Sequence, residues 1–494
     1  MRAVLDLIVL DNRPKYRAEI VQSADLSAKL GDWRSRKGPL YARLADAIAD
    51  CVAYGLLGAQ RLPAERELAE HLGVSRGTVI AAYDALRVRG LARSRRGSGT
   101  FLSVARSSAG SHEAPLFSKL MDPDQAPIDM SMAALRSPEL LADARVSLRD
   151  AMRLFPCHGY APLGAQALRV AIADHLCARR AGPTEPQQIL VTAGGQGALS
   201  LIATGLLRPG DRVLVEAPTY PGAIEVFSRA GARIEALERD HAGVVRDRLE
   251  HALGAGPVRF LYLVPSCHNP TGTTMSEQRR REVLRIAGER GVLTIEDTAM
   301  SELTAQPLPP DLSAIAREQV ISIGSLSKCY WAGIRVGWIR ADPEIVQRLG
   351  RLRAAMDLGG PLLEQAMALT IFDDFDRLTA PTRSAAQERL GILVEQLREH
   401  LPDWNFDEPR GGWSVWAAMP WGDADRFAQL ALRHGVAVAT GGAMAPDDRF
   451  SGHLRLSAGS TPQQIVHGVQ LLAQAWHQMA NQADRDADAI DIPV

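Results

Sequence analysis

Short apolar runs alternate with stretches of helical spacing over most of the chain, from about residue 129 to residue 480. Five runs rich in Val, Ile and Leu are separated by helical lengths, and they cover residues 188–192, 212–216, 258–264, 291–296 and 320–324. Strands buried on both faces have this composition, so we predict a mainly parallel α/β sheet. After about residue 380 a long helix precedes further short apolar runs, which predicts a smaller α+β subdomain.

A helical pattern precedes this region. Apolar side chains recur at helical spacing in residues 39–54, a short helix is predicted at 64–72, and a third at 76–90. The turn before the third helix contains Gly73 and ends at Ser75, which is a favourable N-cap. Two helices joined by a short glycine turn are typical of a helix-turn-helix. The sequence LARSRRGSGTFL that follows predicts a hairpin with a basic, glycine-rich tip.

These patterns divide the chain into five parts. We predict an N-terminal extension (1–37), a winged helix-turn-helix domain (38–103), a linker rich in Ser, Ala, Pro and Asp (104–128), an α/β body (129–480) and a frayed acidic tail (481–494).

Charge is distributed unevenly between these parts. The 494 residues are 46% hydrophobic and 23% charged, as in an ordinary globular protein, with a formal net charge of −1. Residues 31–106 contain 13 Lys and Arg against 7 Asp and Glu, a difference of +6, so the rest of the chain carries −7. A basic segment attached to an acidic body favours nucleic-acid binding by that segment.

Several classes of protein are disfavoured. No run of about 18 apolar residues occurs, and the start of the chain lacks the basic and small-residue features of a signal peptide. The five cysteines are scattered, without the spacing of a disulfide framework or a zinc site. We therefore expect a cytoplasmic protein without a membrane partner.

Chemically useful groups follow the predicted strands. Lys328 lies directly after one strand, in GSLSKCYWAGIRVGW (324–338), where a Schiff-base lysine can be held rigidly. Asp297 ends another strand, where a carboxylate can keep a pyridinium nitrogen protonated, and Asn269 ends a third. The strand, glycine pair and helix at 191–199 suit a phosphate, and Tyr220 could stack on a flat cofactor. Each feature alone also has a purely structural explanation, and Lys328 alone could be a surface lysine.

The segment LPAERELAEHLGVSRGTVIAAYDALRVRGLARSRRGSGTF resembles the winged helix of the GntR family of bacterial regulators. The resemblance implies that Arg66, Ser75, Arg76 and Thr78 hold DNA phosphates and bases and that Gly97 lies at the wing. The alternative is a three-helix bundle with solvated arginines.

The body resembles a fold-type I, class I/II aminotransferase, which implies the cofactor pyridoxal 5'-phosphate. By this resemblance Lys328 forms the internal aldimine, Asp297 pairs with the ring nitrogen, Asn269 binds the ring oxygen and Tyr220 stacks on the ring. The resemblance also implies a set of residues around the phosphate: Gly195, Gln196, Ser325, Ser327 and Arg335. In HGYAPLG (158–164), Tyr160 would reach the phosphate of a second subunit, and in HLRLSAG, Arg455 would grip a carboxylate.

One departure concerns catalysis. Many relatives have a tyrosine two or three residues after the ring aspartate, whereas Thr298, Ala299 and Met300 stand here. Asn269 then binds the ring oxygen alone or with help from Tyr330. Since proton shuttling depends on such groups, efficient transamination is not the expected main role.

The combination of both halves resembles the MocR subfamily of GntR regulators. It implies a homodimer that binds a double-stranded DNA operator and senses an amino compound, or pyridoxal phosphate itself, through an aldimine at Lys328. The alternative is an active pyridoxal-phosphate-dependent aminotransferase that carries a DNA-binding module, and weak half-reactions remain compatible with the retained residues. A third reading, a dimerisation scaffold without cofactor, conflicts with the retained cofactor residues.

Overall fold

The computed structural model describes residues 23–488 with gaps at residues 32, 36–37, 54–56, 58–60, 89–91, 96–98, 103–127, 137–138, 140, 142–145 and 154–157. The chain divides into two compact units, Met1–His112 and Glu113–Val494, and each is described by itself. No helix in the described ranges is both long enough and apolar enough to cross a membrane.

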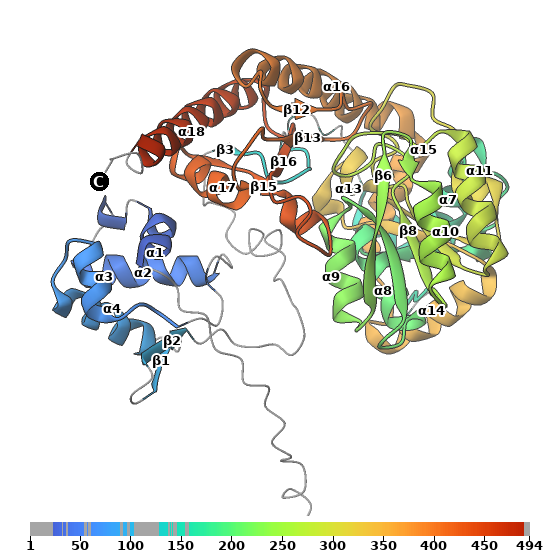
Figure 1. The fold of residues 1–494 in the computed structure, drawn as a ribbon. Coiled ribbons are helices and arrows are strands. Elements are labelled where there is room, and N and C mark those ends of the chain that lie inside the picture. Colours follow the sequence, from blue (N-terminus) through green and yellow to red (C-terminus); the bar gives the residue numbers. More distant parts are fainter. Residues whose placement is uncertain are drawn as a thin grey trace, which may run out of the picture. The chain divides into compact units, whose positions relative to one another are not determined.

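The first unit contains the predicted winged helix-turn-helix. Helices α2 (Leu40–Ala53), α3 (Glu65–His71) and α4 (Arg76–Val88) are followed by the antiparallel strands β1 (Ala92–Arg95) and β2 (Gly99–Leu102) (Figure 1). All three helices contribute fully buried side chains to one core: Leu44, Ile48, Leu68, Val79 and Leu86. The apolar periodicity of the sequence therefore predicted these three helices correctly.

A fourth helix, α1 (Ser23–Leu30), packs on α2 and α3. It lies within the stretch that we predict to be an extension, yet Leu26 and Leu30 are buried in the same core. The short 3-10 helix η1 (Trp33–Ser35) adds the buried Trp33. Residues before position 38 thus complete the apolar core of this unit.

The second unit is built on a large sheet. In the described part of the chain its strand order is β4-β11-β10-β9-β8-β5-β6-β7. The strand bounds are β4 (Ile189–Thr192), β5 (Arg212–Ala217), β6 (Arg233–Asp240), β7 (Gly243–Val244), β8 (Phe260–Leu263), β9 (Leu293–Asp297), β10 (Val320–Ser325) and β11 (Gly337–Arg340). All strands run parallel except β7 and β11. The predicted mainly parallel sheet is confirmed.

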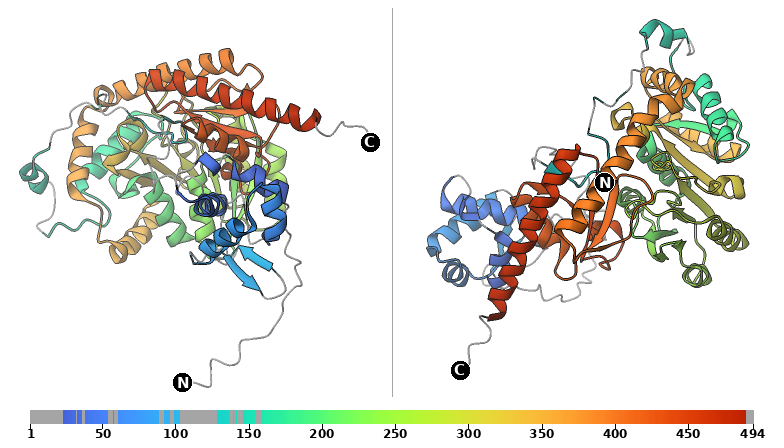
Figure 2. Two further views of the ribbon diagram at one scale, coloured as in Figure 1. Left: turned by 90° about the vertical axis from the view of Figure 1, so that its left-hand side faces the viewer. Right: turned by 90° about the horizontal axis from the view of Figure 1, so that it is seen from above.

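Helices cover both faces of this sheet (Figures 1 and 2). One face packs against α8 (Gly194–Leu206), α9 (Pro221–Arg229) and α14 (Pro343–Met356). The other packs against a larger set: α7 (Gln166–Ala178), α10 (Arg246–Gly254), α11 (Glu277–Glu289), α12 (Leu312–Ile315) and α15 (Leu362–Asp373). Successive strand residues alternate between the two cores, as Val213 and Leu214 do.

The predicted subdomain holds a second, antiparallel sheet in the order β12-β13-β16-β15. Its strands are β12 (Asn405–Phe406), β13 (Ser414–Ala418), β15 (Ala439–Thr440) and β16 (His453–Ser457). The strand β3 (Ile128–Asp129) pairs separately with β14 (Val436–Ala437). Three helices cover one face of the second sheet: α16 (Phe375–His400), α17 (Ala424–Arg433) and α18 (Pro462–Asp488).

Helices α16 and α18 run side by side over the subdomain (Figure 2). Helix α18 continues to Asp488, eight residues into the stretch that we predict to be a frayed tail. Ala and Gln are favourable helix residues, and several of them extend the amphipathic pattern past residue 480.

Candidate functional site

Six strands of the large sheet end at the same edge, because β4, β5, β6, β8, β9 and β10 are parallel. Segments that follow these ends carry the predicted cofactor residues. Their charges act on one another: Asp297 and Arg335 both affect the pKa of Lys328, and both affect that of Tyr220. The structure therefore brings Tyr220, Asp297 and the segment that contains both Lys328 and Arg335 into one site.

Lys328 lies in α13 (Leu326–Cys329), directly after β10. The Ser325 hydroxyl caps this helix by accepting a hydrogen bond from the Ser327 amide (3.2 Å), which fixes the turn that carries the lysine. Lys328 Nζ donates to the Ala133 carbonyl (2.6 Å). Burial, with help from the charge of Arg455, lowers the pKa of Lys328 to about 8. The amine is thus partly neutral near physiological pH, as a nucleophile requires.

Asp297 ends β9 and is buried. Its Oδ2 accepts a hydrogen bond from the Tyr262 hydroxyl (2.8 Å), and its Oδ1 accepts one from the Ala299 amide (2.9 Å). Burial raises the pKa of Asp297, while these hydrogen bonds and the charge of Lys328 oppose the rise. A carboxylate has about four acceptor positions, so capacity remains for a further donor.

Arg455, on β16, is buried and joins the two sheets. Its Nη1 donates to Asn269 Oδ1 (3.1 Å) and its Nη2 donates to the Ser131 carbonyl (2.5 Å). Its Nε is buried without a hydrogen-bond partner in the described structure. Burial lowers the pKa of Arg455 to about 10. A buried guanidinium with an unused donor suits an anionic ligand group such as a carboxylate.

The first turn of α8 forms a place for an anion. Its N-cap, Ala193, offers no side-chain cap, so the first backbone N–H groups lack that partner. Gly194 has a φ of +80°, and a Cβ there would lie 2.9 Å from Arg335 Nη2. Arg335 Nη2 donates to the Ala193 carbonyl (2.5 Å), and its Nη1 lies 3.5 Å from the Ser327 hydroxyl.

Gln196 connects this turn with Tyr220. Its Nε2 donates to the Gly222 carbonyl (3.2 Å), and its Oε1 accepts a hydrogen bond from the Tyr220 hydroxyl (3.1 Å). Burial raises the pKa of Tyr220 to about 12, so the hydroxyl stays protonated. Gly195 follows in the same turn and packs near Ile323.

These observations fit pyridoxal phosphate. A partly neutral lysine, a buried carboxylate, an aromatic ring and a helix N-terminus with a guanidinium lie together, and Arg455 retains an unused donor. Phosphate, ring nitrogen and aldehyde would each find a residue of suitable chemistry.

Tyr160 is not brought to these residues within its own chain. Its side chain is 56% exposed, and its ring stacks on that of His158 (5.8 Å between centroids). An exposed position leaves the ring accessible for the predicted contact with a second subunit.

The residues that stand in place of the missing tyrosine, and Tyr330, have other contacts in the structure. The Thr298 hydroxyl donates to the Ile323 carbonyl (2.8 Å), and Met300 is buried in the core. Tyr330 lies in that same core with Trp413.

Sequence reasoning missed two aromatic residues of the site. Tyr262 supports Asp297, and Trp413 donates from its ring nitrogen to the Lys328 carbonyl (3.3 Å). Neither has a local motif. A stronger signal was available for Lys328, because it is the only lysine among residues 120–494.

The predicted DNA residues lie at the start of α4 and on α3. The Ser75 hydroxyl caps α4 by accepting a hydrogen bond from the Thr78 amide (3.1 Å), and the two side-chain oxygens are 2.9 Å apart. Arg66 and Arg76 are exposed, and Arg76 lies 3.3 Å from Glu65. Gly97 lies outside the described residues.

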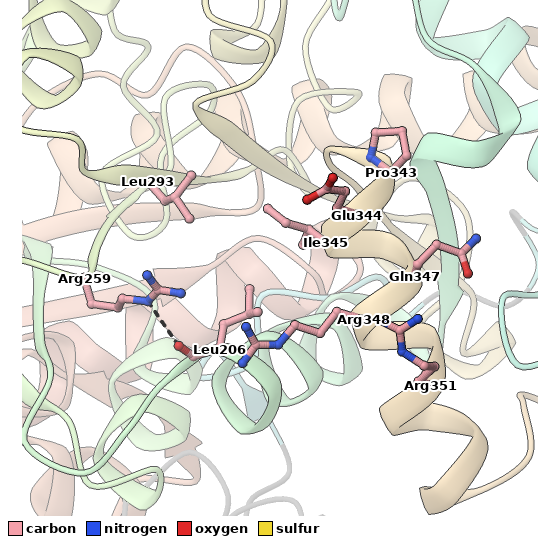
Figure 3. Close-up of a pocket in the computed structure, with 9 residues that line it drawn as sticks. All are labelled: Leu206, Arg259, Leu293, Pro343, Glu344, Ile345, Gln347, Arg348 and Arg351. Carbon is pink, nitrogen blue, oxygen red and sulfur yellow. Dashed lines mark hydrogen bonds between the residues drawn. The ribbon is translucent and has the colours of Figure 1, made fainter.

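A cavity of about 550 Å³ lies elsewhere, near the opposite edge of the sheet, where β9 begins at Leu293 (Figure 3). Arg259 and Arg348 converge there on the C-terminal end of α8, and each donates to one of its carbonyls. These arginines cap the C-terminal end of α8, and none of the predicted cofactor residues lines the cavity.

Comparisons with known proteins agree with this geometry. Residues 137–472 match the model of the aminotransferase class I and II family, and residues 40–102 match that of the bacterial regulatory proteins of the gntR family. An uncharacterized HTH-type transcriptional regulator, YisV of Bacillus subtilis, is 30% identical over 87% of this chain and 95% of its own. A probable rhizopine catabolism regulatory protein, MocR of Rhizobium meliloti, is 30% identical over 76% and 80%.

Among solved structures, the α-aminoadipate aminotransferase LysN of Thermus thermophilus, complexed with N-(5'-phosphopyridoxyl)-L-leucine, is similar. It superposes with a TM-score of 0.68 at 30% identity and covers 73% of this chain and 94% of its own.

Proposed function

The chain belongs to the class I and II aminotransferase family and carries a gntR-family domain, the arrangement of the MocR subfamily, and from this premise we propose that it is a transcriptional regulator dependent on pyridoxal phosphate. Its first unit binds a double-stranded DNA operator in the cytoplasm, and its body senses an amino compound or the cofactor itself. The observation that carries this proposal is a retained Lys328–Asp297–Arg455 site in the same chain as a helix-turn-helix.

Pyridoxal phosphate, when bound, supplies an aldehyde that condenses with primary amines and a ring that withdraws electrons. Lys328 would bind the aldehyde carbon through Nζ, and Asp297 would accept a hydrogen bond from the ring nitrogen. Asn269 would bind the ring oxygen, while Tyr220 would stack on the ring. The phosphate would be held by Gly195, Gln196, Ser325, Ser327 and Arg335.

Sensing would rest on exchange of one amine for another. With pyridoxal phosphate held in the site, an amino compound and Lys328 would compete for the same aldehyde, and this exchange would need no other reactant. Arg455 would bind the carboxylate of this compound, since its unpaired Nε and its planar fork suit two carboxylate oxygens. The freed Lys328 amine would regain the hydrogen bond to the Ala133 carbonyl that the free lysine makes.

The signal would reach DNA only if the effector binds two states of the body with different affinity. Ala133 and Ser131 accept hydrogen bonds from Lys328 and Arg455, and both lie just after the predicted linker. Release of Lys328 would thus change contacts of the segment that leads back to the DNA-binding unit.

DNA binding is proposed for the start of α4. Arg66 and Arg76 are exposed cations for phosphates or bases, and Thr78 lies in the first turn of α4. Ser75 supports this turn as a cap. Gly97 remains a proposed wing residue on sequence grounds.

A homodimer is proposed because large apolar side chains are exposed around Tyr160. They are Leu148, Met152, Met356, Leu358 and Leu363. Helix α6 (Leu148–Arg153) packs on α15, Leu362 approaches Gly159, and Ala161 pairs with Gly359, so these segments are neighbours. Exposed apolar side chains on neighbouring segments favour association with a second copy.

The test uses covalent trapping and DNA binding on the same preparations. Borohydride reduction with pyridoxal phosphate should modify Lys328, as located by mass spectrometry, and Lys328→Ala should abolish the modification of the body. Lys328→Ala should still bind DNA but should lose the change in DNA affinity that amino compounds cause. Lys119→Ala is the control and should behave as wild type. A full effector response in Lys328→Ala would refute sensing through this lysine.

The rival function is an aminotransferase with an added DNA-binding module. It is favoured by the retained Lys328, Asp297 and Arg455 and by the similarity to LysN. Rapid conversion of the bound cofactor to its amino form by one amino acid, followed by absorbance, would make this function primary.

A further inference from the structure

Glu216 is a fully buried carboxylate at the end of β5 that none of the roles above uses. Its Oε2 accepts a hydrogen bond from the Val264 amide (2.7 Å), and its Oε1 lies 3.4 Å from Arg239 Nε. The Arg239 side chain, which reaches over from β6, is 7% exposed. This ion pair lies between neighbouring strands, just below the edge that carries the cofactor residues.

Arg239 also holds the loop 264–273. Its Nη1 donates to the Thr271 hydroxyl (3.1 Å) and its Nη2 to the Thr273 hydroxyl (2.8 Å). His268 Nδ1 lies 2.9 Å from the Thr271 hydroxyl, and its Nε2 lies 3.5 Å from Glu216 Oε2. Burial lowers the pKa of His268 far below its usual value, so the ring contributes no charge.

Two cofactor residues depend on the segments that this pair joins. Tyr220 follows Glu216 by four residues, in the segment that leaves β5. Asn269 lies at the tip of the loop 264–273, where its side chain accepts a hydrogen bond from Arg455. Glu216 and Arg239 therefore bind both the segment of Tyr220 and the loop of Asn269 to the same two strands.

Stability alone is a weak reason for such a pair. Removing two charges from water costs several kcal/mol per ion, and apolar replacements of buried ion pairs are often neutral or stabilising. A charged pair in this place is better explained by positioning, because charge-assisted hydrogen bonds fix the distance and direction between the segments that they join.

We propose that Glu216 and Arg239 are positioning residues, which set the placement of Tyr220 and Asn269 around the cofactor ring. The inference rests on the proposed function, since it concerns the same site. It assigns no contact between either residue and the cofactor.

The test is Glu216→Gln in the full chain, titrated with pyridoxal phosphate. The glutamine keeps an oxygen for the Val264 amide but removes the charge opposite Arg239. We expect affinity for the cofactor to fall at least tenfold and the pH midpoint of the bound cofactor's absorbance to shift. Glu235→Gln is the matched control, because Glu235 pairs with Arg212 (2.6 Å) across the same two strands at their other end. It should change neither quantity.

Thr273→Val serves if Glu216→Gln does not fold. It removes one acceptor of Arg239 while leaving the ion pair, and it should lower affinity at least threefold and shift the same midpoint. Wild-type affinity and spectrum in the folded variants would overturn the positioning role while leaving the proposed function intact. A wild-type protein that binds no pyridoxal phosphate would overturn both.

Discussion

Lys328 is made reactive by its surroundings. An ordinary lysine has a pKa near 10.4 and is almost wholly protonated at neutral pH. Burial and the charges of Arg455 and Arg335 lower the pKa of Lys328 to about 8, while Asp297 acts in the opposite direction. The neutral fraction is then about one tenth at pH 7 and about one half at pH 8.

Attachment of pyridoxal phosphate should therefore depend on pH in a defined window. Only the neutral amine attacks the aldehyde, so the rate should rise as pH increases through about 8 and then level off. Asp297→Asn removes the charge that favours protonated Lys328, so it should move this midpoint to lower pH. Stopped-flow absorbance at several pH values measures the midpoint of the attachment rate in wild type and in Asp297→Asn. A rate that keeps rising to pH 10 would contradict the lowered pKa.

At the level of elements, the first turn of α8 combines two features that support each other. The helix has no side-chain cap, and Gly194, with a φ of +80°, lets Arg335 approach. A Cβ at this position would lie 2.9 Å from Arg335 Nη2 and would displace the guanidinium. An anion there would meet both backbone N–H groups and the guanidinium.

Gly194→Ala should therefore weaken binding of pyridoxal phosphate at least tenfold. Gly210→Ala is a matched control, because Gly210 has a φ of +90° and open space around its Cβ position. Both variants should lose about 1–3 kcal/mol of unfolding free energy from backbone strain, and only the first should lose affinity. Isothermal titration with pyridoxal phosphate and with pyridoxal separates the phosphate contribution. Equal affinities of the two variants would exclude the proposed cradle.

Some of the strands could be predicted from the sequence and others could not. The run 320–324 predicted β10 because it is rich in the apolar residues that are typical of strands buried on both faces. Strand β6, RIEALERD, was missed because it lies next to the sheet edge and alternates with charged residues. Strand β11 has four residues and follows a 3-10 turn, η4 (Ala332–Ile334), so it offers no periodicity.

The same limit applies to the candidate site. Local motifs identified Lys328 and Asp297, which stand at the ends of buried strands, whereas Arg455 was assigned by resemblance to the aminotransferase family. Tyr262 and Trp413 support them from positions that read as ordinary strand and core residues. Their roles depend on distances between segments, which local patterns do not contain.

At the scale of the whole molecule, DNA recognition by helix-turn-helix proteins usually needs two copies at paired half-sites. The exposed apolar side chains around α6 and α15 provide a surface for a second copy. Leu363 on α15 is 48% exposed, so a charge placed there should disturb association without opening the core. The dimer would also bring Tyr160 to a second subunit.

Leu363→Glu should therefore be monomeric in analytical ultracentrifugation at concentrations where wild type is dimeric. Burying two like charges in a symmetric interface is unfavourable, because each meets its own copy or apolar surface. On a duplex selected by wild type from random sequence, the variant should bind at least tenfold more weakly. On one half-site of that duplex it should bind as wild type does. Trp421→Glu, which changes an exposed apolar residue of the subdomain, should leave dimer and DNA affinity unchanged. A dimeric Leu363→Glu would place the association surface elsewhere, and the paired half-site argument would then rest on another face of the body.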